Sequence, residues 1–253
     1  MHRAAAQERT PSLRFFAKLI VAFVGMLGLR LDETRPLGLF LAWLIVFVVC
    51  LLVYGQAFIW GDTPVDKLRP WVIGYAAMAW MSYYIGLSVV LGTGLREWMI
   101  ARWGPERTRQ VFNAVMGIIF LNQGLAHGAV YEVWPGTMGG LPRPVFAAAG
   151  FALFLFGAGC KLWATYLASL DTYYYNDMLL GRAGNANGER VLAGPYRWFK
   201  NPMYGVGNLQ GYGSALIAAS WQGLVVTAVF HASIYCFYFM FERSFVARAY
   251  RPQ

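Results

Sequence analysis

Two prolines, two cations and two tyrosines lie within the eleven residues Gly194-Pro195-Tyr196-Arg197-Trp198-Phe199-Lys200-Asn201-Pro202-Met203-Tyr204, directly before an apolar run that reaches almost to the C-terminus. Proline fixes its own φ and pushes the residue before it toward an extended conformation, so this backbone is stiff. Arg197 and Lys200 make the segment basic. A rigid cationic loop at a bilayer surface suits an anionic cosubstrate or a lipid headgroup.

Two other features bear on the same chemistry. Glu242 lies where the last apolar run ends, and an acidic residue at the end of a membrane span needs a partner. Arg243 beside it is one candidate; a hydroxyl or amine of a cosubstrate is the other. Gly157 and Gly159 stand in an earlier apolar segment, where small residues are typical of close packing between membrane helices.

Polar and aromatic residues elsewhere leave alternatives open. The stretch Asp171-Thr172-Tyr173-Tyr174-Tyr175-Asn176-Asp177 could anchor the chain at the membrane interface. Equally, its three tyrosines could stack on an adenine, with Asp171 or Asp177 taking a ribose hydroxyl. His127, together with Asn122 and Gln123, is expected to make hydrogen bonds between helices, with contact to a headgroup or a role in proton transfer as the alternative for His127.

The composition is that of a membrane protein. Of the 253 residues, 58% are hydrophobic and only 13% are charged, whereas soluble domains are nearer half apolar and a quarter charged. A net charge of +9 would suggest nucleic acid in a soluble protein, but the excess of cations in loops on one side of a membrane explains it, and no nucleic-acid partner is expected. The three cysteines lie in apolar runs without paired spacing, so neither a disulfide framework nor a metal site is expected.

Hydropathy predicts an all-α, polytopic bundle. Each of six apolar segments approaches the ~20 residues that a helix needs to cross a bilayer: Leu37–Phe58, Trp71–Leu91, Val111–Val130, Val145–Ala168, Met203–Ala219 and Gly223–Phe241. The region Leu13–Leu29 is apolar but contains Arg14 and Lys18, which favours a helix lying in the interface, with a seventh span as the alternative.

Loop charges predict the orientation. Every second loop is basic, as an even number of spans with both termini in the cytoplasm requires. The 17 arginines against 4 lysines favour a GC-rich bacterial source, hence a bacterial cytoplasmic membrane. We expect residues 1–253 to form one integral-membrane domain, with the chemistry in residues 157–250.

The motifs resemble a known family. Asn201-Pro202-Met203-Tyr204, the glycine-rich segment after it, and Phe241-Glu242-Arg243-Ser244-Phe245-Val246-Ala247-Arg248-Ala249-Tyr250 are similar to the C-terminal third of phosphatidylethanolamine N-methyltransferases. These enzymes belong to a wider group of membrane methyltransferases that includes the isoprenylcysteine carboxyl methyltransferases. Much of that group has Arg-His-Pro where this chain has Lys200-Asn201-Pro202, so the phospholipid branch is favoured. Arg243 replaces the second of two adjacent acidic residues.

The resemblance implies methyl transfer from S-adenosylmethionine to the amine of a phospholipid, without a metal. The acceptor amine must lose a proton before it attacks, and Glu242 is the predicted catalytic residue. The residues expected to bind the cosubstrate are Gly157, Gly159, Asp171, Tyr173, Asn201, Pro202, Met203, Tyr204, Glu242 and Arg243. Those expected to contact the lipid substrate are His127, Tyr196, Arg197 and Lys200.

Other functions remain open alternatives. Within the same class, the acceptor could be a small thiol or an isoprenylcysteine carboxylate. A sterol-type membrane reductase would use NADPH instead, and a non-catalytic scaffold or transporter would bind neither cosubstrate. The sequence makes no prediction of oligomeric state.

Overall fold

The computed structural model describes residues 13–30, 65–182 and 191–249, and every regular element in these ranges is helical. The long helices are α3 (Val65–Gly92), α5 (Pro105–Val133), α6 (Arg143–Ala168) and α10 (Trp221–Phe237). The shorter elements are α1 (Leu13–Met26), α4 (Leu95–Trp103), α7 (Leu170–Tyr173), α8 (Asn176–Leu180), α9 (Leu209–Ile217) and α11 (Arg243–Ala249), with 3₁₀ turns η1 (Gly194–Arg197) and η2 (Val206–Asn208) and a π-helical turn η3 (Tyr238–Glu242). The predicted all-α class is confirmed.

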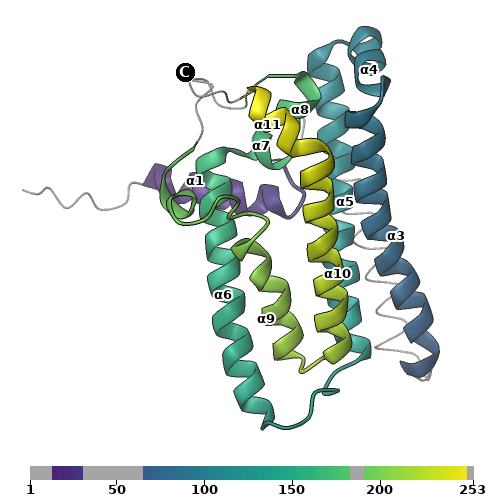
Figure 1. Cartoon of the computed structure of the whole chain (residues 1–253), viewed down its shortest axis with the longest axis vertical. Coiled ribbons are helices and arrows are strands. Elements are labelled where there is room, and N and C mark those ends of the chain that lie inside the picture. The colour runs from purple at the N-terminus through teal and green to yellow at the C-terminus, as the bar shows by residue number, and fades with distance from the viewer. Residues whose placement is uncertain (1–12, 31–64, 183–190, 250–253) are drawn as a thin grey trace, which may run out of the picture.

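Four described helices are long and apolar enough to cross a membrane. They are α3, α5, α6 and the continuous run Trp221–Arg248, and the shorter α9 lies between α6 and α10 (Figure 1). Their outer faces carry apolar side chains that are largely exposed, such as Trp71 (79%), Met78 (63%) and Leu155 (66%). Soluble proteins rarely expose so much apolar surface, so these faces are suited to lipid and the protein is an integral membrane protein.

The predicted number of six spans is not confirmed. The first predicted span, Leu37–Phe58, lies outside the described residues. The predicted span Met203–Ala219 is not one helix but a turn, η2 and the nine-residue helix α9. Nine residues rise only about 14 Å, less than half of the ~30 Å hydrocarbon core.

Helix α1 lies across the long helices rather than along them (Figure 1). Just beyond its end, the buried Arg30 forms an ion pair with Asp171 at 3.0 Å and lies 5.1 Å from the centre of the Tyr174 ring. The Tyr174 hydroxyl in turn donates to the carbonyl of Gly25 at 2.8 Å. A crosswise helix of 14 residues fits the predicted interfacial helix better than a seventh span.

Glycines bring α9 against α6. A Cβ on Gly213 would stand 2.6 Å from the carbonyl oxygen of Gly150, and one on Gly157 would overlap the backbone nitrogen of Gln210. Small residues at such positions allow helix backbones to approach closely. The short link to α10 ends with Ser220, whose Oγ accepts from the Gly223 N–H at 3.0 Å and caps that helix, so α9 and α10 form a tight hairpin.

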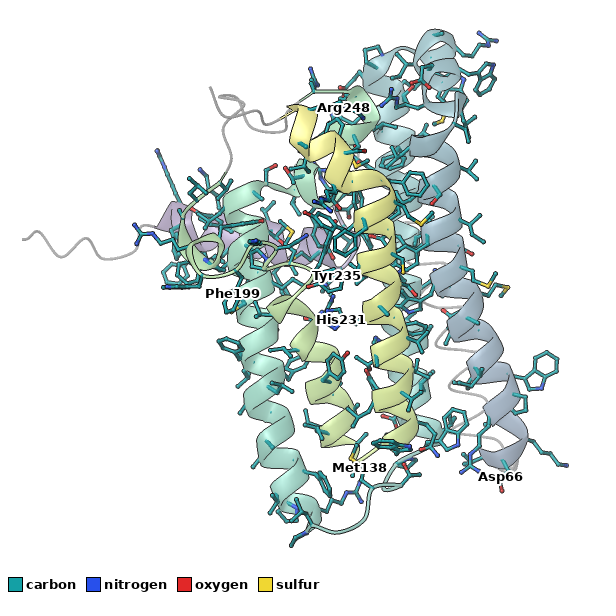
Figure 2. All side chains as sticks on the ribbon, viewed as in Figure 1. Asp66, Met138, Phe199, His231, Tyr235 and Arg248 are labelled. Carbon is teal, nitrogen blue, oxygen red and sulfur yellow. The ribbon has the colours of Figure 1, made fainter. Side chains whose placement is uncertain are left out.

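The two ends of the bundle differ in the residues that they carry. Arg248 lies at one end, and Asp66 and Met138 lie at the other (Figure 2). Helices α4, α7, α8 and α11 gather at the Arg248 end (Figure 1).

Candidate active site

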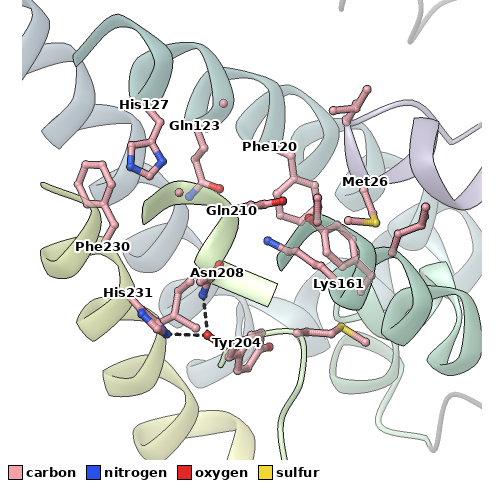
Figure 3. A pocket seen from close by; sticks show the side chains of 18 of the residues that line it. Met26, Phe120, Gln123, His127, Lys161, Tyr204, Asn208, Gln210, Phe230 and His231 are labelled. Carbon is pink, nitrogen blue, oxygen red and sulfur yellow. Dashed lines mark hydrogen bonds between the residues drawn. The ribbon is translucent and has the colours of Figure 1, made fainter. Parts of the chain in front are cut away.

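A cavity of about 980 Å³ lies among α1, α3, α5, α6, α9 and α10. This volume is at the upper end of the range for small-molecule sites, about 300–1,000 Å³. The walls are mostly apolar or aromatic, and polar groups enter from several helices, as Figure 3 shows for one part of the cavity. A large apolar cavity with a few convergent polar groups is where a ligand site is expected.

The loop before α9 forms one wall of this cavity. Asn201, Met203 and Tyr204 line it, whereas Pro202 is fully buried beside it. The Pro202 carbonyl accepts from the Gly207 N–H at 2.8 Å, and the Asn201 carbonyl accepts from the Gly205 N–H at 2.9 Å. Pro202 therefore shapes the turn that presents its neighbours to the cavity.

The Tyr204 backbone carbonyl is held from two sides. Asn208 Nδ2 donates to it at 2.7 Å, and His231 Nε2 lies at the same distance (Figure 3). A carbonyl only accepts, so Nε2 of His231 carries the proton, and its Nδ1 accepts from the Tyr212 hydroxyl at 3.1 Å. His231 extends from α10 into the interior (Figure 2), so this contact attaches the loop to α10.

Tyr204 and Glu242 are joined by a short hydrogen bond. The Tyr204 hydroxyl donates to Glu242 Oε2 at 2.6 Å, and both residues line the cavity. Glu242 ends the π-helical turn between α10 and α11, a local widening of the helix that is frequent at functional sites. Two motifs 38 residues apart in sequence thus meet at one point.

Further tyrosines extend this contact. The Tyr175 hydroxyl lies 2.9 Å from that of Tyr204 and 2.9 Å from that of Tyr83. Each hydroxyl has a single proton, so when Tyr204 donates to Glu242, Tyr175 donates to Tyr204 and Tyr83 donates to Tyr175. Burial, followed by the nearby tyrosines and Glu242, raises the pKa of Tyr175, and burial, followed by Glu242, raises the pKa of Tyr204. Both phenols therefore remain protonated donors.

Nine of the predicted site residues line the cavity: His127, Gly159, Tyr173, Tyr196, Lys200, Asn201, Met203, Tyr204 and Glu242. They come from α5, α6, α7, η1 and the loop after it, and the end of η3. Five other predicted residues are not part of the lining: Gly157, Asp171, Arg197, Pro202 and Arg243. The structure thus brings most of the predicted set together around one cavity.

The residues outside the lining have other contacts. Asp171 forms an ion pair with Arg30 and accepts from Asn176 Nδ2 at 2.9 Å. Arg243 is exposed and lies 5.9 Å from the centre of the Phe239 ring, while the hydrogen-bond partner of Glu242 is Tyr204.

The two predicted motif glycines have different surroundings. Gly157 packs against α9, whereas a Cβ on Gly159 would meet nothing within 4 Å. Gly157 is therefore a packing residue, and Gly159 borders open space in the cavity.

Hydrogen bonding between helices, predicted for the polar residues of α5, is confirmed for two of them. The Tyr75 hydroxyl of α3 donates to Asn122 Oδ1 at 2.7 Å. His127 Nε2 lies 3.0 Å from Thr227 Oγ1 of α10.

Lys161 and Gln210 line the cavity but are absent from the predicted set. Lys161 carried a clear signal, because it is the only charged residue between Val145 and Ala168 and ionisable residues within spans are usually functional. Gln210, by contrast, could not be predicted from the sequence, because only the packing of α9 brings it to the cavity. Among the described residues, no group of three or more His, Cys, Asp or Glu side chains could hold a metal ion.

Known proteins resemble the C-terminal part of the chain, which supplies most of the predicted residues that line this cavity. Residues 145–253 match the phospholipid methyltransferase family. A phosphatidylethanolamine N-methyltransferase of Talaromyces marneffei is 30% identical over 105 residues, which are 42% of this chain and 10% of that protein. The same enzyme of Laccaria bicolor is 32% identical over 102 residues, 40% of this chain and 11% of that protein.

The chain spans about a tenth of the length of these relatives in the matched region. No solved structure matches it. The resemblance to phospholipid methyltransferases is thus confirmed for residues 145–253, the part of the chain that contains the Asn201–Tyr204 loop and Glu242.

Proposed function

We propose that this protein is a membrane methyltransferase that transfers methyl groups from S-adenosylmethionine to the amine of a phospholipid similar to phosphatidylethanolamine. The observation that carries the proposal is the 2.6 Å hydrogen bond between Tyr204 and Glu242 at the cavity wall. It unites the two motifs through which the sequence resembles phospholipid methyltransferases. The names of the matched family and of the fungal relatives support the same substrate class.

The cavity fits a nucleoside cosubstrate in size and in chemistry. Gly159 leaves open space beside α6, and the Asn201 side chain has no hydrogen-bond partner among the described residues. Asn201, Met203, Tyr204 and Tyr173 would hold the cosubstrate there. When bound, S-adenosylmethionine supplies an electrophilic methyl group on its sulfonium.

Glu242 would act as the base. A primary amine is protonated near neutral pH and must lose that proton before its lone pair can attack. In the proposed step the N–H bond breaks and the proton moves to a carboxylate oxygen of Glu242. The freed lone pair forms the new N–C bond, and the electrons of the old methyl–sulfur bond stay on sulfur. Tyr204 holds the carboxylate in position, which is the alignment that displacement requires.

The lipid substrate would enter from the bilayer side, and the basic segment Gly194–Tyr204 would face the aqueous side. Lys200 and Tyr196, both in the cavity lining, would contact the headgroup, with Arg197 at the exposed rim. Loop charges favour a site on the cytoplasmic face with both termini on that side. The bacterial cytoplasmic membrane remains a prediction, since the matched relatives named above are fungal.

Calorimetry on the detergent-purified chain tests the class of enzyme. We expect S-adenosylmethionine to bind and NADPH not to bind; the reverse result would support the reductase alternative, and binding of neither would support a scaffold. Glu242→Gln should abolish methyl transfer in a folded protein. Glu97→Gln, a change at an exposed acid on α4, is the matched control and should retain activity.

A further inference from the structure

Lys161 is a cation inside a candidate membrane span. It stands seven residues before the end of α6 and lines the cavity. Within the described ranges it makes neither a hydrogen bond nor an ion pair. A charged ammonium in an apolar setting is costly unless it is paired, so the structure leaves a place for an anion at this side chain.

Two amides enter the cavity near the same point. Gln123 on α5 and Gln210 on α9 both belong to the lining, and Figure 3 shows them extending toward the same space as Lys161. Gln123 Nε2 is buried and has no hydrogen-bond partner within the described part of the chain. Buried N–H donors without an acceptor are rare in proteins, and one that lines a cavity points to a bound ligand as its acceptor.

Glycines explain why these groups meet. Gly157 and Lys161 are four residues apart, so they share one face of α6. The backbone of Gln210 packs onto Gly157, and a Cβ on Gly207 would stand 3.0 Å from Lys161 Cβ. Close contact at Gly157 therefore brings α9 next to Lys161, and the missing side chain at Gly207 leaves room for the lysine stem.

The charges of the cavity complement a zwitterion. Among its described lining residues, Glu242 is the only acid, and Lys161 and Lys200 are the lysines. If the proposed function holds, the acceptor amine lies at Glu242. Both reactants carry an anionic group near their amine: a phosphodiester in the lipid headgroup and a carboxylate in the methionine part of the cosubstrate.

We propose that Lys161, Gln123 and Gln210 form an oxyanion-binding site for one of the two reactants. The ammonium of Lys161 supplies a charge-assisted hydrogen bond, and the two amides supply further N–H donors. The identity of the ligand rests on the proposed function, whereas the donor site itself rests on the cavity. The oxyanion is either the lipid phosphodiester or the cosubstrate carboxylate.

Direct binding tests the site without requiring turnover. The full-length protein in detergent is titrated with short-chain phosphatidylethanolamine, with the matching diacylglycerol that lacks the phosphate, and with S-adenosylmethionine. We expect Lys161→Met to weaken the binding of either phosphatidylethanolamine or S-adenosylmethionine by about tenfold or more, which is the effect of losing a charge-assisted hydrogen bond to the oxyanion of that ligand. Diacylglycerol binding should not change. Lys161→Arg should retain much of the affinity, and Lys67→Met, at an exposed lysine of α3, is the matched control.

The pattern of loss identifies the source of the oxyanion. Weaker phosphatidylethanolamine binding alone assigns the phosphodiester, and weaker S-adenosylmethionine binding alone assigns the carboxylate. Gln123→Leu should weaken the binding of the same ligand that Lys161→Met affects. This variant provides the test if the lysine variant does not fold. Unchanged affinity for both ligands in these variants overturns the site, as does a wild-type protein that binds neither. Lys161-dependent binding without any methyl transfer would instead refute the proposed function and leave the site standing.

Discussion

Replacing Tyr204 by phenylalanine removes one hydroxyl from the centre of the proposed site. The ring volume is preserved, so its edge-on contact with Tyr238 at 6.2 Å should persist. The 2.6 Å hydrogen bond to Glu242 is lost, and the Tyr175 hydroxyl loses its acceptor. We therefore expect a folded protein with an impaired base.

The size of the effect follows from the type of bond. A hydrogen bond to a charged group contributes about 1.5–3 kcal/mol. Each 1.4 kcal/mol corresponds to a factor of ten, so kcat should fall roughly 10- to 150-fold. If Tyr204 mainly positions the base, the KM for the lipid should change much less than kcat.

The assay follows labelled methyl groups from S-adenosylmethionine into extracted lipid, with far-UV circular dichroism as the test of folding. Tyr235→Phe is the matched control, because Tyr235 lies on α10 outside the cavity lining and its hydroxyl has no hydrogen-bond partner among the described residues. The control should keep full activity. Wild-type kcat in Tyr204→Phe would refute the role assigned to this hydrogen bond.

Three further predictions follow from the same contacts. Gly157→Ala should lower stability by about 1–3 kcal/mol, because its Cβ would press on the Gln210 backbone. Gly159→Ala should not lower stability, because nothing lies within 4 Å of its Cβ. Thermal unfolding in detergent compares the two variants. Asn201→Ala should weaken S-adenosylmethionine binding about tenfold, measured by calorimetry, and unchanged affinity would remove this loop from the cosubstrate site. Burial and Glu242 raise the pKa of Tyr204 in the folded protein. Above about pH 10, the Tyr204 hydroxyl therefore loses its proton in the unfolded chain but keeps it in the folded protein. This difference favours the unfolded chain, so stability should fall as the pH rises. Tyr204→Phe should make that fall shallower in alkaline unfolding curves.

The long helices could be predicted because length and hydropathy suffice to define them. The predicted segments Trp71–Leu91, Val111–Val130 and Val145–Ala168 fall within α3, α5 and α6. The segment Met203–Ala219 met the same criteria and still failed to form one span. Its first residues are held in a turn by the backbone bond from Gly207 to Pro202, and α9 packs on the glycines of α6. These tertiary contacts have no signature in hydropathy.

The partners of charged groups were the hardest feature to predict. The sequence offered Arg243 or a cosubstrate as the partner of Glu242, and the structure supplies Tyr204. A ribose hydroxyl was one of the predicted partners of Asp171, whereas the structure pairs Asp171 with Arg30, which is 141 residues away in sequence. A contact between adjacent residues can be predicted from the sequence, but contacts such as Tyr204–Glu242 and Arg30–Asp171 form only when the chain folds.

The central claim is that Glu242 and the Tyr204 loop carry methyl transfer to a lipid amine. The most direct measurement incubates the purified protein in phosphatidylethanolamine vesicles with radiolabelled S-adenosylmethionine and separates the lipids by chromatography. We expect label in N-methylated phosphatidylethanolamine for the wild type and none for Glu242→Gln. Absence of labelled lipid with the folded wild type, or equal labelling by Glu242→Gln, would contradict the account.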